Sequence, residues 1–103
     1  HLDGPNALRH LDALMAIPEL DALQWVPGAG NEGFVRWIDV YRRAQAAGKG
    51  LWISCGLDEV PDVMAALDSH GVCLAVHGVP TLEAGEELLR RAEDWCTGRL
   101  YAA

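Results

Sequence analysis

The chain has 103 residues, half of them hydrophobic and 22% charged, which excludes a disordered protein and indicates one domain, residues 1–103, with a buried core. Its formal charge of −7 has the wrong sign for neutralising phosphates, so we expect neither nucleic acid nor a membrane surface as a partner. No apolar run is long enough to cross a bilayer, and no secretory leader pattern is present.

The cysteines and the first residues bear on cellular setting. Cys55, Cys73 and Cys96 are odd in number, far apart and without a C-x-x-C pair, so neither a disulfide framework nor a zinc ribbon is expected. We therefore expect a reducing, cytoplasmic location. The chain opens at His1 without an initiator methionine, which is typical of a cut chain or of a processed start.

Helix and strand patterns alternate along the first half of the chain. Apolar residues recur at helical spacing from Pro5 to the break at Pro18. The apolar run at residues 21–26 (DALQWV) predicts a buried strand that leads into a loop. A second helix is expected from about Gly33 to Gly48, with one broad apolar face.

The second half repeats the alternation. Residues 51–55 (LWISC) predict a strand, and Asp58 is expected to cap a helix that ends at Gly71. Residues 72–77 (VCLAVH) predict the next strand, with Cys73 packed in it. Thr81 is expected to cap the last helix.

The expected fold class is α/β. The strands are near-continuous apolar runs and each is followed by an amphipathic helix, the pattern of βαβ units around a parallel sheet. With a strand ending at His1, the chain holds four consecutive β/α units. Such a (β/α)4 unit is either a small open doubly wound sheet or half of a TIM-type (β/α)8 barrel, completed by oligomerisation or by an N-terminal half.

Candidate site residues follow from the rule that ligands bind at the carboxyl ends of the strands in both architectures. The loops there bring His1, Gln24, Ser54, Cys55 and His77 to one rim. His77 is a candidate general acid or base, or a rim histidine with a structural role. Cys55 is a candidate thiolate nucleophile or metal ligand, or a small buried residue.

Two further patterns suggest metal or anion binding. His1 and Asp3 form an H-x-D pair that is able to bind zinc with a third ligand, although an aspartate before Gly-Pro also forms turns. Gly28 and Gly30 precede a helix and are able to present backbone N–H groups to a carboxylate or phosphate. With Gly33 they nearly spell a dinucleotide fingerprint, but the acidic residue expected after the next strand is absent.

Three segments carry a family resemblance: HLDGPNALRHLDALMAIPELDALQWVPGAG, WIDVYRRAQAAGK and VPTLEAGEELLRRAEDW. Together they resemble the C-terminal part of the uroporphyrinogen decarboxylase superfamily, which includes corrinoid- and cobalamin-dependent methyltransferases, and most closely an uncharacterised branch. The resemblance covers essentially the whole chain and about the last third of a family member. It implies that this chain is the last four β/α units of a (β/α)8 barrel.

The resemblance also bears on chemistry. In the methyltransferases it implies a zinc site with an H-x-C motif and a later cysteine. His1 matches the first ligand, but Asp3 and Val79 stand at the two cysteine positions, so two of three zinc ligands are altered. A set of His1, Asp3 and His77 remains as an alternative. The decarboxylases bind substrate through early-barrel residues that this chain does not contain, so decarboxylation by this chain alone is not expected.

Three functions are therefore open. The first is a decarboxylase-like or methyltransferase-like barrel half, an enzyme part that contributes its rim loops to a small-molecule site with His1, Asp3 and His77 as catalytic candidates. Gln24, Gly28, Gly30 and Cys55 are its substrate-binding candidates. The second is an oligomerising half-barrel without retained chemistry, and the third is a flavodoxin-like ligand-binding module. Free sheet edges predict a homodimer or larger oligomer.

Overall fold

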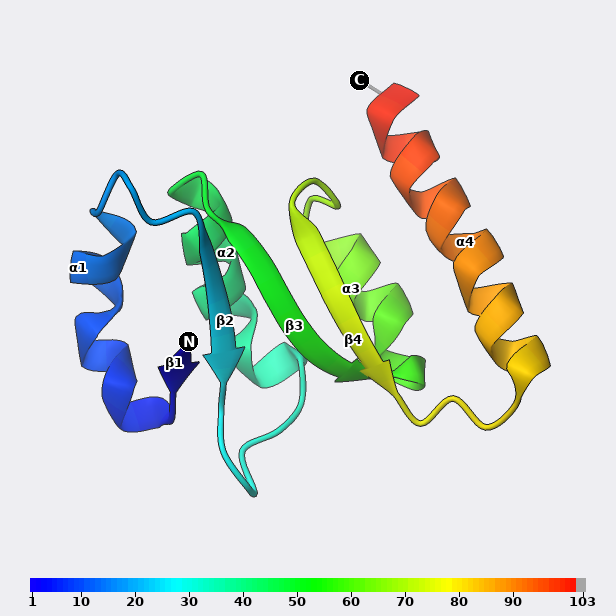
Figure 1. Ribbon diagram of the computed structural model, residues 1–103, viewed down its shortest axis with the longest axis horizontal. Coiled ribbons are helices and arrows are strands. Elements are labelled where there is room, and N and C mark those ends of the chain that lie inside the picture. Colours follow the sequence, from blue (N-terminus) through cyan, green and yellow to red (C-terminus); the bar gives the residue numbers. More distant parts are fainter. Residues whose placement is uncertain (102–103) are drawn as a thin grey trace.

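The computed structural model describes residues 1–101, with side chains described as far as Cys96. Four strands alternate with helices along the chain (Figure 1). The strands are β1 (Leu2–Asp3), β2 (Ala22–Val26), β3 (Gly50–Gly56) and β4 (Val72–His77). The helices are η1 (Pro5–His10), α1 (Leu11–Met15), η2 (Val35–Trp37), α2 (Ile38–Ala46), η3 (Leu57–Glu59), α3 (Val60–Ala66) and α4 (Leu82–Tyr101).

All four strands run parallel, in the spatial order β1-β2-β3-β4. The expected α/β class and the run of four β/α units are thereby confirmed. Because each strand lies beside the next one in sequence, crossovers of the usual hand place the helices on one face of the sheet. Figure 1 shows α2 and α3 behind the sheet and no helix in front of it. Within residues 1–101 the strand order does not reverse, unlike the order of a doubly wound sheet.

The core lies between the sheet and the helices behind it. Leu23, Ile53 and Val63 are almost fully buried there. Phe34 stacks on Tyr41 with ring centroids 5.5 Å apart, which packs the start of α2 into this layer. The broad apolar face expected for the second helix is confirmed, because Val40, Tyr41 and Ala44 are all buried.

The helix boundaries correct one expectation and confirm another. Asp58 does not cap the third helix, because the backbone N–H of Gly56 donates instead to the carboxylate of Glu59, at 2.9 Å. Thr81 does cap the last helix, since its hydroxyl oxygen accepts from the N–H of Ala84 at 3.1 Å. Gly48 ends α2 with a φ of 77°, a conformation that favours glycine.

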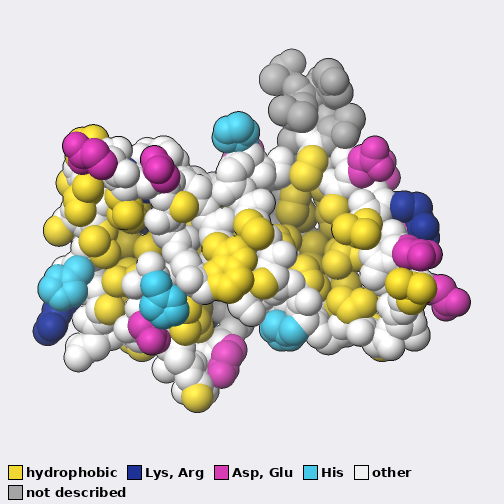
Figure 2. Space-filling view, viewed as in Figure 1, with side chains coloured by type: hydrophobic (Ala, Val, Ile, Leu, Met, Phe, Trp, Pro, Cys, Tyr) yellow, Lys and Arg dark blue, Asp and Glu magenta, His cyan; other side chains and the backbone are white. Residues whose placement is uncertain are grey.

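The opposite face of the sheet is uncovered, and this changes the position of several predicted residues. Trp52 in β3 is 40% exposed although it lies in the middle of a strand. Cys73 is its register partner in β4 and is also exposed, so its expected packing role is wrong. Figure 2 shows apolar side chains at the centre of this face, with histidine and acidic side chains toward the lower margin to which the strands point.

The sheet divides between β2 and β3. Their pairing ends at Gln24 and Trp52. By contrast, β3 pairs with β4 as far as Gly56 and His77, and β2 pairs with β1 as far as Val26. The carboxyl-terminal halves of β2 and β3 therefore diverge, as Figure 1 shows. No helix in the described residues is long and apolar enough to cross a membrane.

Candidate functional site

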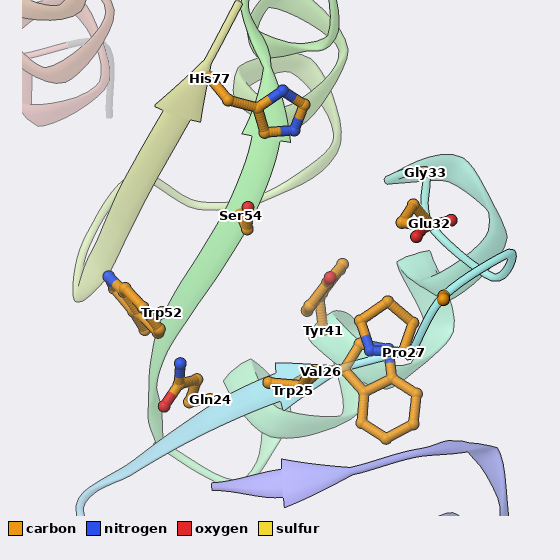
Figure 3. A pocket seen from close by; sticks show the side chains of 12 residues that line it. Gln24, Trp25, Val26, Pro27, Glu32, Gly33, Tyr41, Trp52, Ser54 and His77 are labelled. Atoms are coloured by element: carbon orange, nitrogen blue, oxygen red, sulfur yellow. The ribbon is translucent and has the colours of Figure 1, made fainter.

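A pocket of about 340 Å³ opens where β2 and β3 diverge. Twelve residues line it, drawn in Figure 3. Gln24, Trp52 and Ser54 come from the uncovered face of the sheet, and His77 comes from the end of β4. This volume is at the lower end of the range typical of small-molecule sites.

Tyr41 reaches the pocket from α2, on the helix side of the sheet. Figure 3 shows it between β3, which carries Ser54, and β2, which carries Trp25. Burial, and then the charges of Cys55 and Glu59, raise the pKa of Tyr41 to about 12. The phenol is therefore neutral at physiological pH and available as a hydrogen-bond donor.

The loop after β2 forms the other side of the pocket. Its residues at Pro27, Gly28, Glu32 and Gly33 line the cavity. The indole N–H of Trp37 donates to the carbonyl oxygen of Asn31 at 2.7 Å and so ties this loop to the start of α2. Gly28 has a φ of 90°, which bends the chain away from the end of β2.

The carboxylate of Glu59 also holds this loop in place. One carboxylate oxygen accepts from the N–H of Phe34 at 2.7 Å, and the other accepts from Gly56 at 2.9 Å. These two hydrogen bonds hold the pKa of Glu59 below its usual range, and the charge of nearby His77 acts in the same direction. The carboxylate joins the end of β3 to the loop that begins α2.

The pocket brings together four of the predicted site residues: Gln24, Gly28, Ser54 and His77. His1 lies beside them, because its Nδ1 is 3.1 Å from the amide oxygen of Gln24 and donates to it. Contrary to the prediction, Gln24 and Ser54 do not lie in rim loops. They lie within strands and point out of the uncovered face, since side chains alternate between the two faces of a sheet.

Besides His1, which lies beside the pocket, three predicted residues lie outside it. Cys55 is 1% exposed on the helix side of β3, so its placement on the rim is wrong. Its burial, and then the carboxylates of Glu59 and Asp58, raise the pKa of the thiol to about 11, which opposes a nucleophilic role. Asp3 lies on β1, not in a turn, and Gly30 does not line the cavity.

The predicted metal ligands do not come together. His1 and Asp3 are close, with Nε2 and Oδ2 3.6 Å apart. His77 is three strands away across the sheet, about 14 Å at the usual strand spacing. Among the residues that the structure describes, no three His, Cys, Asp or Glu side chains are grouped so that they could hold a metal ion. The set of His1, Asp3 and His77 is therefore not a zinc site in this chain alone.

The glycine loop is not arranged as a phosphate cradle. The N–H of Phe34, which would face a bound anion, already donates to the Glu59 carboxylate. Glu32 is the one Asp or Glu among the twelve lining residues, and none of the twelve is Lys or Arg. A phosphate group there would lie near a negative charge without a compensating cation, so the loop is not suited to binding a dinucleotide.

The lining residues that sequence reasoning missed include Trp25, Glu32, Tyr41 and Trp52. Trp52 could have been identified. Within LWISC, Trp52 and Ser54 are less apolar than their neighbours, and side chains at alternate positions of a strand point to the same face. Tyr41 was not detectable, because it is a core residue of α2 and reaches the pocket only where β2 and β3 separate.

Trp25 is 2% exposed, and its indole N–H has no acceptor among the described residues. Its ring packs edge-on against Trp37, with centroids 5.0 Å apart.

Comparison with known proteins gives no match to a family model, to a curated protein or to a solved structure.

Proposed function

We propose that this chain is half of a (β/α)8-type barrel and that it contributes a small-molecule site at the carboxyl ends of its strands. The observation that carries the proposal is the cavity between β2 and β3, which gathers Gln24, Ser54 and His77 around an aromatic floor. Parallel β/α folds bind ligands at this end of the sheet. The sequential strand order with one uncovered face supports a barrel half over an open doubly wound sheet.

The residues have distinct roles in this proposal. His77 is the candidate general acid or base, because its imidazole lies at the end of β4 and faces the cavity (Figure 3). Gln24 binds polar substrate groups and is oriented by the hydrogen bond from His1. The sequence resemblance suggests decarboxylation or methyl transfer as the reaction class, in an assembly that supplies the other four strands.

A thermal denaturation screen tests the small-molecule site. The probes are nucleotides, short thiols, tetrapyrroles, and small neutral and charged organic molecules, because a ligand that binds only the folded state raises Tm. We expect at least one probe to raise Tm for the wild type and for His70→Ala, and to do so less for His77→Ala. His70 is exposed at the opposite end of β4, which makes it a matched control. Equal shifts in all three proteins contradict this site.

A second function, a non-catalytic oligomerising half-barrel, is favoured by one observation. Trp52 exposes 40% of its surface on the uncovered face, where a second half would cover it. Native mass spectrometry with metal analysis tests this. A metal-free dimer that Trp52→Lys converts to a monomer, with no ligand found in the screen, supports the structural role. A metal-free monomer of the wild type contradicts assembly from two copies.

A further inference from the structure

The walls of the pocket between β2 and β3 suggest which ligands it accepts. Glu32 is the one acidic residue that lines it, and no lysine or arginine lies among its twelve lining residues. Arg36, in η2, does not line the pocket and donates to the carbonyl oxygen of Gly30 at 3.3 Å and to the Asn31 side chain at 3.4 Å. The cavity therefore offers a negative charge and no fixed positive side chain.

A second carboxylate is bonded to the loop that lines the pocket. Glu59 accepts hydrogen bonds from the N–H groups of Phe34 and Gly56, and these hold its pKa below its usual range. Its charge reaches Tyr41, where it contributes to the raised pKa of the phenol. Burial is the largest cause of that raised pKa, and the negative charge of Glu59 adds a smaller contribution, which acts against a bound anion.

The remaining wall is aromatic. Trp25, Tyr41 and Trp52 all line the cavity (Figure 3), and Trp52 is the one of the three whose ring is substantially exposed. Aromatic rings carry negative charge on their faces and attract ammonium groups, tryptophan most strongly. Sites that bind organic cations typically combine aromatic rings with a carboxylate and contain no fixed positive side chain.

We propose that this pocket selects a small organic cation, such as a methylated amine, over neutral and anionic molecules of the same shape. The inference rests on the proposed small-molecule site and specifies its ligand class. In the bound state the ammonium group lies against the exposed ring of Trp52, and Glu32 supplies the counter-charge.

Three probes of similar shape test the selection: tetramethylammonium, tert-butanol and pivalate. Each is titrated into isotopically labelled protein at constant ionic strength, and dissociation constants come from the NMR shifts of the Trp52 indole and the Gly28 amide. We expect tetramethylammonium to bind about tenfold more tightly than tert-butanol, with pivalate weakest, as a desolvated cation–aromatic contact predicts.

Variants identify the groups responsible. Glu32→Gln is expected to weaken tetramethylammonium binding about fivefold and to leave tert-butanol unchanged. Glu19→Gln, at an exposed glutamate in the turn before β2, is the control and is expected to change neither. Trp52→Leu is expected to weaken the cation about tenfold.

The outcomes separate the two proposals. If tert-butanol or pivalate shifts the pocket signals at least as strongly as the cation, the small-molecule site stands and the cation preference is overturned. If no probe moves these signals while another compound of the screen raises Tm, the cation preference is again overturned. If nothing binds in either experiment, the small-molecule site itself is overturned.

Discussion

The carboxylate of Glu59 accepts a hydrogen bond of 2.7 Å from the backbone N–H of Phe34, which lies 25 residues earlier in the chain. Its other oxygen accepts from Gly56 at 2.9 Å, at the end of β3. One side chain therefore fixes the loop after β2 against the strand that bounds the other side of the pocket. The cavity owes its shape to this connection and to the separation of β2 from β3.

Removal of this carboxylate is expected to destabilise the protein. Glu59→Ala leaves the N–H groups of Phe34 and Gly56 without their acceptor, which costs about 2–3 kcal/mol in free energy of unfolding. Asp58→Ala is the control, since Asp58 is exposed, and it is expected to cost under about 0.5 kcal/mol. Urea denaturation measures both values, and equal losses would show that Glu59 does not hold the loop.

The same carboxylate predicts an acid dependence. Because the pKa of Glu59 is lowered in the folded state, its contribution to stability is fully present above the unfolded pKa of about 4.3. That contribution is lost as the pH falls through the lower, folded pKa. Urea midpoints measured from neutral pH to strongly acidic pH are therefore expected to fall more steeply for the wild type than for Glu59→Gln. Parallel curves for the two proteins would refute this contribution.

The three cysteines are expected to differ in reactivity. Cys73 and Cys96 are exposed, whereas Cys55 is 1% exposed and its thiol pKa is raised to about 11. Near neutral pH, iodoacetamide is therefore expected to label two sites quickly, and Cys55 only when the protein unfolds. Peptide mass spectrometry identifies the sites. Rapid labelling of Cys55 in the folded protein would mean that β3 does not bury it against the helices.

One glycine substitution is expected to stabilise the chain. Gly85 lies in α4, and a Cβ there would meet only the Val79 side chain, at an ordinary contact distance of 3.6 Å. Gly85→Ala is therefore expected to raise the free energy of unfolding by up to about 1 kcal/mol. Gly28→Ala is expected to lower it by about 1–2 kcal/mol, because φ is 90° at Gly28. Thermal denaturation distinguishes the two, and a loss of stability in Gly85→Ala would contradict the position of α4 against Val79.

The local parts of the fold could be predicted from the sequence. Residues 72–77 form β4 with the expected boundaries, because a short apolar run between Gly71 and Gly78 favours a buried strand. The hydroxyl of Thr81 caps α4 as its residue type and position indicate. Such features depend on neighbours within a few residues in the sequence.

The site could be predicted only in part. Gln24, Gly28 and His77 were identified from their place near strand ends, and they do share a pocket. Cys55 was misplaced because an apolar run does not show which of its faces meets the helices. The place of Tyr41 in the pocket could not be predicted, because it depends on the separation of β2 from β3. These strands are more than 20 residues apart, and no local sequence pattern shows how they diverge.

The central claim is that the cavity between β2 and β3 binds a small molecule, and mapping of a bound ligand by NMR tests it most directly. With the best probe of the thermal screen, we expect shifts at Gly28, Trp52 and His77 together, and none at His70. Another apolar groove, lined in part by Met64, Leu88 and Trp95, has a volume of about 220 Å³. Shifts confined to that groove, or the absence of shifts at Gly28 and Trp52, would contradict the account.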